Sequence, residues 1–126
     1  MSEPRVQRVL SSDDQIAPKK YEFRIDSRRL IVQVEPDLIV GRRQNDEPDD
    51  DVDIDLGRFG AGEQGVSRKH VQLLVEAGDV FVTDLQTTNG TRLNGKTLRP
   101  GQPYRLRDSD ELELGRLRLT VRFMWT

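Results

Sequence analysis

Hydrophobic and polar residues alternate with a period of two along most of the chain after residue 19. Tyr21, Phe23 and Ile25 are separated by charged residues, which is typical of a strand with one buried face. The alternation returns in the segments 30–34, 52–56, 71–75, 80–82, 104–106 and 112–114, and its longest run covers 117–123. No long segment has the 3.6-residue period of an amphipathic helix. The pattern therefore predicts short β-strands.

Turn-forming residues stand between these segments. Asp26-Ser27, Ala77-Gly78-Asp79 and Asn94-Gly95 each separate two apolar runs, as in hairpins. Short strands joined by such turns favour an all-β fold, and we predict a two-sheet antiparallel β-sandwich over residues 20–124 with its functional loops at one end. Residues 1–19 are polar and have no sustained period, which predicts a disordered tail.

Composition narrows the class of protein. The chain has 126 residues, enough for one domain, and a formal net charge of -2, so no strong positive field argues for nucleic acid. The absence of cysteine excludes disulfides, thiolate nucleophiles and cysteine-based zinc sites. No apolar run resembles a signal peptide or a membrane span. We expect a monomeric cytoplasmic protein that does not bind membranes.

The segment Asp46–Asp55 carries seven acidic residues out of ten. Clustered carboxylates are ligands for hard cations such as calcium, so a metal-binding loop is one interpretation. However, Val52, Ile54 and Leu56 alternate with acids, and the glycine and glutamate of a calcium loop are not in register. We therefore favour a strand with its acids facing solvent, and we predict no metal.

The segment Gly57–Gly65 holds four glycines in nine residues and predicts a flexible loop. A nucleotide-binding loop is the competing interpretation. No Gly-Lys-Ser/Thr follows, and no G-x-G-x-x-G lies between a strand and a helix. We predict no nucleotide and no other cofactor.

The candidate functional residues come from three separate stretches. Val66–Val71 contains a hydroxyl, two cations and the one histidine of the chain; Gly41-Arg42 lies upstream and Thr87–Thr91 downstream. Five side chains in these stretches donate well to anionic oxygens, namely Arg42, Ser67, Arg68, Thr88 and Asn89. If the loops converge, they can hold a phosphate. An ordinary N-cap role for Ser67 is an alternative.

Catalysis is not predicted. His70 has no cysteine partner, and no hydrolase triad spacing is visible around it. The residues indicate a binding protein and not an enzyme.

Taken in order, these motifs resemble the forkhead-associated (FHA) domain, a phosphothreonine-binding β-sandwich. The resemblance covers residues 21–123 and rests on Gly41-Arg42, Asp53-Ile54-Asp55-Leu56, Ser67-Arg68-Lys69-His70, Asp84–Thr91 with Asn94-Gly95, and Leu106–Gly115. The chain departs from the family pattern at three places. Gln86-Thr87 stands where Gly-Ser is common, Arg92 where an aromatic residue is common, and Ser109 where Gly is usual. These departures affect the shape of the loops and the preference for flanking residues, but they remove no phosphate ligand.

The resemblance implies a role for each position. Arg42, Ser67, Arg68 and Thr88 contact the phosphate, and Asn89 holds the peptide backbone. Gly41, His70 and Gly90 are structural, and His70 braces the loop that carries Ser67. The family discriminates against phosphoserine.

The resemblance thus implies a phosphothreonine-dependent peptide-binding module in Ser/Thr kinase signalling. Its partner is a protein that an upstream Ser/Thr kinase has phosphorylated. A phospho-independent assembly domain and a metal-binding module built on the acidic segment are the alternatives. The acids of Asp46–Asp55 also predict that a bound peptide favours basic residues away from its phosphate.

Overall fold

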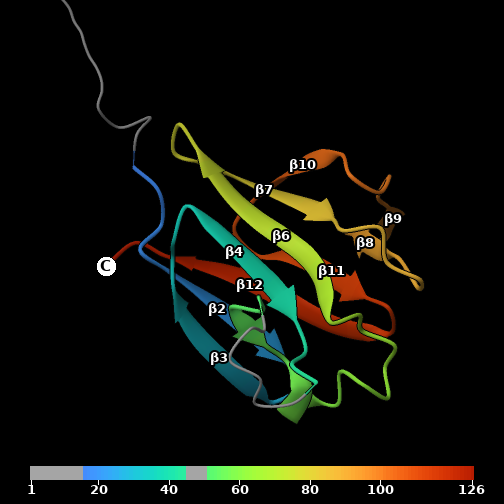
Figure 1. Ribbon diagram of the computed structural model, residues 1–126. Helices are drawn as coiled ribbons and strands as arrows, with labels where there is room; N and C mark the ends of the chain where they lie inside the picture. Colours follow the sequence, from blue (N-terminus) through green and yellow to red (C-terminus); the bar gives the residue numbers. More distant parts are fainter. Residues whose placement is uncertain (1–15, 45–50) are drawn as a thin grey trace, which may run out of the picture.

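Two β-sheets pack face to face in the computed structural model, which describes residues 16–44 and 51–126 (Figure 1). One sheet has five strands in the spatial order β10-β7-β6-β4-β5, and the other has six in the order β3-β2-β12-β11-β8-β9. A short 3₁₀ helix, η3 (Gly57–Phe59), lies outside the sheets. The predicted all-β sandwich is confirmed.

Strands of the five-stranded sheet adjoin all of the candidate site residues: Arg42 follows β4, Ser67 and Arg68 precede β6, and Thr88 and Asn89 follow β7. The strands of this sheet are β4 (Asp37–Gly41), β5 (Ile54–Asp55), β6 (Lys69–Glu76), β7 (Asp79–Asp84) and β10 (Pro103–Leu106). The pair β4–β5 is parallel, and the other neighbours are antiparallel. The predicted purely antiparallel pairing is therefore corrected at this pair, because β5 starts level with Val40 and runs in the direction of β4.

The six-stranded sheet is antiparallel throughout. Its strands are β2 (Lys20–Ile25), β3 (Arg28–Gln33), β8 (Thr91–Leu93), β9 (Lys96–Thr97), β11 (Asp110–Leu114) and β12 (Leu117–Met124). The β8–β9 hairpin turns at Asn94-Gly95, with φ of 50° and 85°. Positive φ at both turn residues matches the twist of the paired strands.

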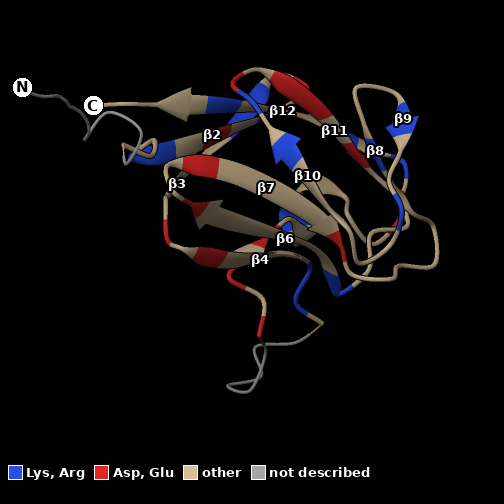
Figure 2. Cartoon of the chain, turned by 90° about the horizontal axis from the view of Figure 1, so that it is seen from above, with Lys and Arg blue, Asp and Glu red and all other residues tan. Residues whose placement is uncertain are grey.

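The alternating apolar residues fill the space between the sheets. The buried set includes Tyr21, Phe23, Val71, Leu73, Val80, Val82, Leu112, Leu114, Leu119 and Val121. Burying each such side chain contributes about 1.5–3 kcal/mol before the cost of ordering the chain. Most charged residues stay outside, with Glu22 and Asp84 as buried exceptions, and Figure 2 shows Lys and Arg interspersed with Asp and Glu over both sheets. The sandwich is thus a rigid support for its loops.

The acidic-apolar segment around β5 has one buried apolar face and one face whose aspartates accept backbone hydrogen bonds. Val52, Ile54 and Leu56 are buried. Asp53 accepts a hydrogen bond from the amide of Ile39 at 2.8 Å, and Asp55 accepts one from the amide of Arg43 at 3.0 Å. The predicted strand is real but only two residues long, and the amides of Asp53 and Leu56 on either side of it still donate to the carbonyls of Ile39 and Gly41 in β4.

The glycine-rich segment 57–65 is a loop, as predicted, but the sandwich anchors it. Phe59 is buried, and the guanidinium carbons of Arg28 and Arg58 lie 4.8 and 5.0 Å from the centre of its ring. The amide of Val66 donates to the carbonyl of Ala61 at 2.9 Å. The loop therefore enters β6 from a fixed position.

The predicted tail falls mostly on residues 1–15, outside the described residues. Residues 16–19 lie against the sandwich. Pro18 is buried, the amide of Lys19 donates to Met124 at 2.8 Å, and its carbonyl accepts from Val34 at 3.0 Å. Packed chain thus begins a few residues before the predicted boundary at Lys20. No helix in the described ranges has the length and apolar character needed to cross a membrane.

Candidate functional site

The end of β4 lies against the residues that precede β6. The β4–β6 register shifts between Val40 and Gly41, and the amide of Arg42 donates to the carbonyl of Arg68 at 3.0 Å. A Cβ placed on Gly41 would lie only 1.8 Å from that carbonyl oxygen. A glycine is therefore required here to bring Arg42 and Arg68 together.

The side chain of Arg42 is half-buried and oriented by one contact. Its Nε–H donates to the carbonyl oxygen of Val66 at 2.6 Å. No carboxylate in the described ranges pairs with its guanidinium. The two Nη groups of Arg42 therefore remain available for an anionic ligand.

His70 joins two of the loops. The ring is fully buried; Nδ1 accepts a hydrogen bond from the amide of Ser67 at 2.9 Å, and Nε2 lies 2.9 Å from the carbonyl oxygen of Gly90. An amide can only donate, so the ring proton sits on Nε2 and donates to Gly90. Burial lowers the pKa of His70, although the Gly90 carbonyl and the charge of Asp84 act in the opposite direction. The ring is therefore neutral at pH 7.

Asp84 organises the loop that follows β7. This buried carboxylate accepts hydrogen bonds from the hydroxyls of Thr87 at 2.7 Å and Thr91 at 2.5 Å, and from the amide of Thr87 at 3.2 Å. The Thr87 hydroxyl in turn accepts from the amide of Gly90 at 3.0 Å. Burial raises the pKa of Asp84, but the bonds from Thr91 and Thr87 and the nearby His70 lower it overall. An ionised side chain thus fixes the backbone around Thr88 and Asn89.

Asn89 connects this loop to the glycine-rich segment. Its Nδ2 donates to the carbonyl oxygen of Gly65 at 2.9 Å. The amide of Gly115 donates to Gly90 at 3.0 Å, and a Cβ on Gly115 would approach the Gly65 carbonyl oxygen to 2.6 Å. Close backbone packing here places the β11–β12 turn beside Asn89.

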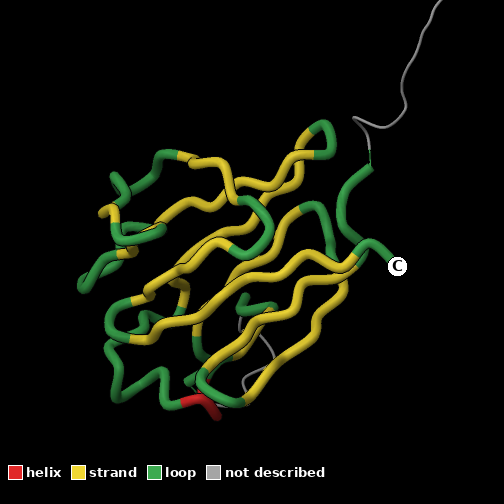
Figure 3. Tube along the Cα trace, turned by 180° about the vertical axis from the view of Figure 1, so that it is seen from behind, coloured by secondary structure: helices red, strands yellow, loops and turns green. Residues whose placement is uncertain are grey.

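The three stretches predicted from sequence therefore meet at one end of the sandwich, where Figure 3 shows loops gathered at the ends of the strands. Ser67 is half-buried, whereas Arg68 and Thr88 are exposed. Within the described ranges, the side chains of Ser67, Arg68 and Thr88 have no hydrogen-bond partner. The structure brings hydroxyl, guanidinium and amide donors into neighbouring loops and leaves several of them free.

The sequence reasoning missed the residues that hold this geometry. Asp84, Thr87 and Thr91 lie within the Asp84–Thr91 motif, but the sequence alone predicts no role for their side chains. An aspartate with threonines three and seven residues later is the available signal, because such side chains bind nearby backbone and hydroxyl groups in turns. Arg116 was also missed; its Nη2 donates to the carbonyl of Glu63, 53 residues earlier, at 2.6 Å.

The described acidic residues near the site have other partners. Asp51 forms an ion pair with Lys69 at 2.8 Å. Residues 45–50, which hold the rest of the predicted acidic loop, lie outside the described residues. Within 16–44 and 51–126, no three His, Asp or Glu side chains gather as a metal site would require. The described residues give the metal-binding interpretation no support.

Comparison with known families decides the relationship. The family model described as "FHA domain" matches residues 38–115, a span that contains every residue of the predicted site. This chain belongs to the FHA domain family. The predicted resemblance is confirmed.

Related proteins support the same assignment. Protein FraH of Nostoc sp. is 36% identical over 64 residues, which are 51% of this chain and 22% of FraH. A solved structure from work on phosphothreonine-dependent FHA domain interactions is 27% identical, with a TM-score of 0.61 over 82% of this chain and 96% of that one. The FhaA FHA domain, solved in complex with the intracellular domain of Rv3910, is 28% identical, with a TM-score of 0.60 over 81% of this chain and 99% of that one. The FHA domain here spans about a fifth of FraH.

Proposed function

We propose that this FHA domain binds phosphothreonine peptides through Arg42, Ser67, Arg68, Thr88 and Asn89, and that it acts in Ser/Thr kinase signalling by recognising a protein that an upstream kinase has phosphorylated. One observation carries the proposal: the buried ring of His70 joins the Ser67 loop to the Gly90 loop. The donor side chains on both loops therefore share one fixed frame.

The chemistry of the free donors suits a phosphate. A phosphothreonine carries about −1.5 to −2 charge and three acceptor oxygens. Arg42 and Arg68 supply two positive charges, and Ser67 and Thr88 supply hydroxyl donors. Charge-assisted hydrogen bonds of this kind are about twice as strong as neutral ones. The site therefore discriminates a phosphorylated side chain from an unmodified one chiefly by charge.

Asn89 has a different task in the proposed complex. Its Nδ2 is already held by the carbonyl of Gly65, which fixes the plane of the amide. Its Oδ1 has no partner within the described ranges and accepts a hydrogen bond from a peptide amide. Asn89 thus fixes the ligand backbone beside the phosphate, and the ligand binds as an extended segment.

The test is calorimetry with a degenerate phosphothreonine peptide pool, followed by one selected peptide in three forms. We expect the phosphothreonine form to bind, the phosphoserine form to bind more weakly, and the unphosphorylated form to show no measurable heat. Equal affinity for the phosphorylated and unphosphorylated forms would overturn the proposal and favour a phospho-independent assembly domain.

A further inference from the structure

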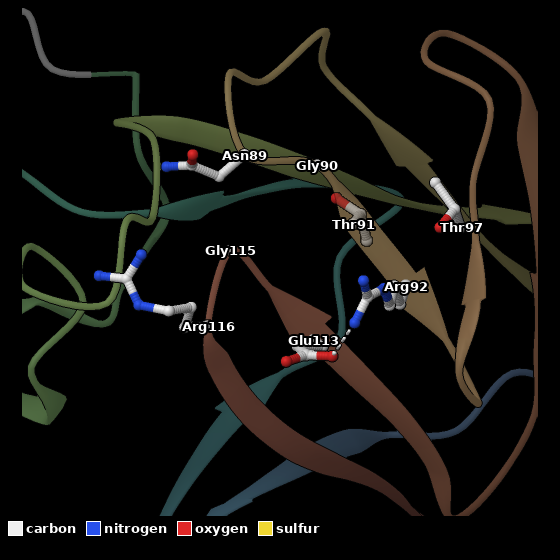
Figure 4. A pocket seen from close by; sticks show the side chains of 8 residues that line it. All are labelled: Asn89, Gly90, Thr91, Arg92, Thr97, Glu113, Gly115 and Arg116. Carbon is white, nitrogen blue, oxygen red and sulfur yellow. Dashed lines mark hydrogen bonds and ion pairs between the residues drawn. The ribbon is translucent and has the colours of Figure 1, made fainter.

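A groove of about 390 Å³ has Asn89, the proposed peptide contact, among its lining residues (Figure 4). Its walls come from the β7–β8 loop, strands β8, β9 and β11, and the β11–β12 turn. Its charged lining residues are Arg92, Glu113 and Arg116. Because Asn89 belongs both to this lining and to the proposed peptide contact, a peptide held by Asn89 has its next residues at the mouth of the groove.

The charges on the two sides of the groove are not equivalent. Arg92 forms an ion pair with Glu113 at 3.3 Å, so this side is nearly neutral. Arg116 lies at the opposite edge, next to Asn89 and Gly65; Figure 4 shows its guanidinium directed away from Arg92 and Glu113, and its Nη2 donates to the neutral carbonyl of Glu63. No carboxylate in the described ranges pairs with Arg116. The edge of the groove next to Asn89 and the glycine-rich loop therefore has an uncompensated positive charge, and Arg116 has N–H groups without a partner within the described ranges.

We propose that this groove binds an acidic side chain of the peptide ligand, Asp or Glu, and that Arg116 is the residue that selects it. The inference rests on the proposed function, which brings the peptide to Asn89, and it concerns the flanking position next to the β11–β12 turn; the basic preference expected from Asp46–Asp55 concerns positions next to that segment. A carboxylate at the edge next to Asn89 gains a charge-assisted hydrogen bond from Arg116. An apolar side chain would take water from the guanidinium without replacing its hydrogen bonds.

The pair Arg92–Glu113 makes this selection feasible. A free Glu113 would repel an acidic ligand residue across the groove. Its pairing with Arg92 removes most of that repulsion. Many FHA domains have an aromatic residue at the position of Arg92. Here Arg92 contributes to the preference for an acidic ligand residue by neutralising Glu113, and not by contacting the ligand.

The competing explanation is that Arg116 only braces the glycine-rich loop. Its amide donates to Gln64 at 2.7 Å, and its side chain donates to Glu63. A bracing residue would affect all phosphopeptides equally. A selecting residue affects only peptides that place an acid in the groove, so the two roles give different results.

The experiment uses one phosphothreonine peptide with Asp or Asn substituted at each flanking position in turn. Binding is measured for the wild type, for Arg116→Gln and for Arg107→Gln. Arg107 is a matched control because it is an exposed arginine whose side chain has no ion pair or hydrogen bond within the described ranges. It lies in the β10–β11 turn, at the opposite end of β11 from Arg116. Melting curves confirm that each variant is folded.

At one flanking position, we expect the wild type to bind the Asp peptide about tenfold more tightly than the Asn peptide, as for one hydrogen bond to a charged group. Arg116→Gln should reduce this ratio to about twofold or less while leaving affinity for the Asn peptide nearly unchanged, and Arg107→Gln should keep it. Glu113→Gln, which releases Arg92, should leave or increase the ratio.

Two results would overturn the inference while phosphate-dependent binding stands. One is the absence of an acid preference at any flanking position. The other is an equal loss of affinity for both peptides in Arg116→Gln, which would assign Arg116 a bracing role. Failure to prefer any phosphorylated peptide would instead overturn the proposed function, and the selection by Arg116 with it.

Discussion

The Nε2–H of His70 donates a hydrogen bond to the carbonyl oxygen of Gly90 at 2.9 Å, and this contact joins strand β6 to the loop that carries Thr88. The same carbonyl oxygen accepts from the amide of Gly115 at 3.0 Å. On the other side of the ring, Nδ1 accepts from Ser67. A side chain that does not reach the surface therefore sets the relative position of the two loops proposed to hold the phosphate.

His70→Ala should first lower stability and then, as a consequence, binding. The change leaves the amide of Ser67 without its acceptor and opens a cavity in a fully buried position. Such losses cost about 2 kcal/mol or more, which corresponds to a fall in Tm of about 10 °C for a domain of this size. Thermal melts measure the first effect, and calorimetry below the melting range measures the second. A variant that melts normally but no longer binds would place His70 in contact with the ligand instead.

Stability should also depend on pH through the same ring. The pKa of His70 in the folded protein is lowered from its ordinary value of 6.5. The unfolded chain therefore takes up a proton near that pH before the folded protein does, so stability is fully present above pH 6.5 and falls as the pH falls towards the folded-state pKa. Denaturant titrations between about pH 7.5 and pH 5.5 should show this decline, since carboxylates titrate mostly lower. His70→Gln, which cannot titrate, should be less stable at pH 7.5 but nearly flat over the same range.

The sequence predicted the strands well, because a strand with one buried face has alternating apolar and polar residues, as in 21–25 and 117–123. It also predicted which loops carry the donors, because each donor lies in a recognisable local motif. It did not predict the contacts between loops. The bond between Arg116 and Glu63 and the parallel pairing of β5 with β4 depend on the path of the chain between distant segments. The spacing of residues within one motif does not determine how segments far apart in the sequence pack together.

Two departures from the family pattern coincide with left-handed backbone, which gives a prediction about stability. Gln86 has φ of 60° and Ser109 has φ of 71°, and both stand where the family commonly has glycine. A left-handed backbone conformation destabilises the fold by about 1–2 kcal/mol at a non-glycine residue. Glycine avoids this strain but lowers stability by about 0.4–1 kcal/mol, because it increases the conformational entropy of the unfolded chain. Gln86→Gly and Ser109→Gly should therefore each raise stability by about 0.5 kcal/mol, or Tm by a few degrees. Gln102→Gly is the matched control, because Gln102 is not at positive φ; it should be neutral or destabilising.

Asp84→Asn should loosen the loop that carries Thr88 and Asn89. The substitution replaces an acceptor of three hydrogen bonds with an amide that presents donors to at least one of them. A buried network broken in this way costs about 1–3 kcal/mol. We expect a lower Tm and a severalfold weaker affinity for the phosphopeptide. Asp79→Asn, at the other end of β7, breaks only a partly exposed ion pair with Arg105 and should change both quantities little. Equal effects in the two variants would show that Asp84 has no special role in fixing the loop that carries Thr88 and Asn89.

Arg42 provides the strongest test of how the phosphate is bound. Its Nε–H is occupied by Val66, so the ligand is left with the two Nη groups of a guanidinium whose plane is already fixed. Losing a hydrogen bond to a charged group costs about 1.5–3 kcal/mol, so Arg42→Ala should weaken phosphopeptide binding by about tenfold to a hundredfold or more. Arg42→Lys should recover only part of that affinity, because an ammonium keeps the charge but cannot both hold the Val66 carbonyl and present a planar fork. Arg107→Ala, which removes the same charge at an exposed position in the β10–β11 turn, should change affinity by less than about twofold at physiological salt. Calorimetry on the phosphorylated peptide, with melting curves for each variant, measures all three, and normal binding by a folded Arg42→Ala protein would exclude Arg42 as the main partner of the phosphate.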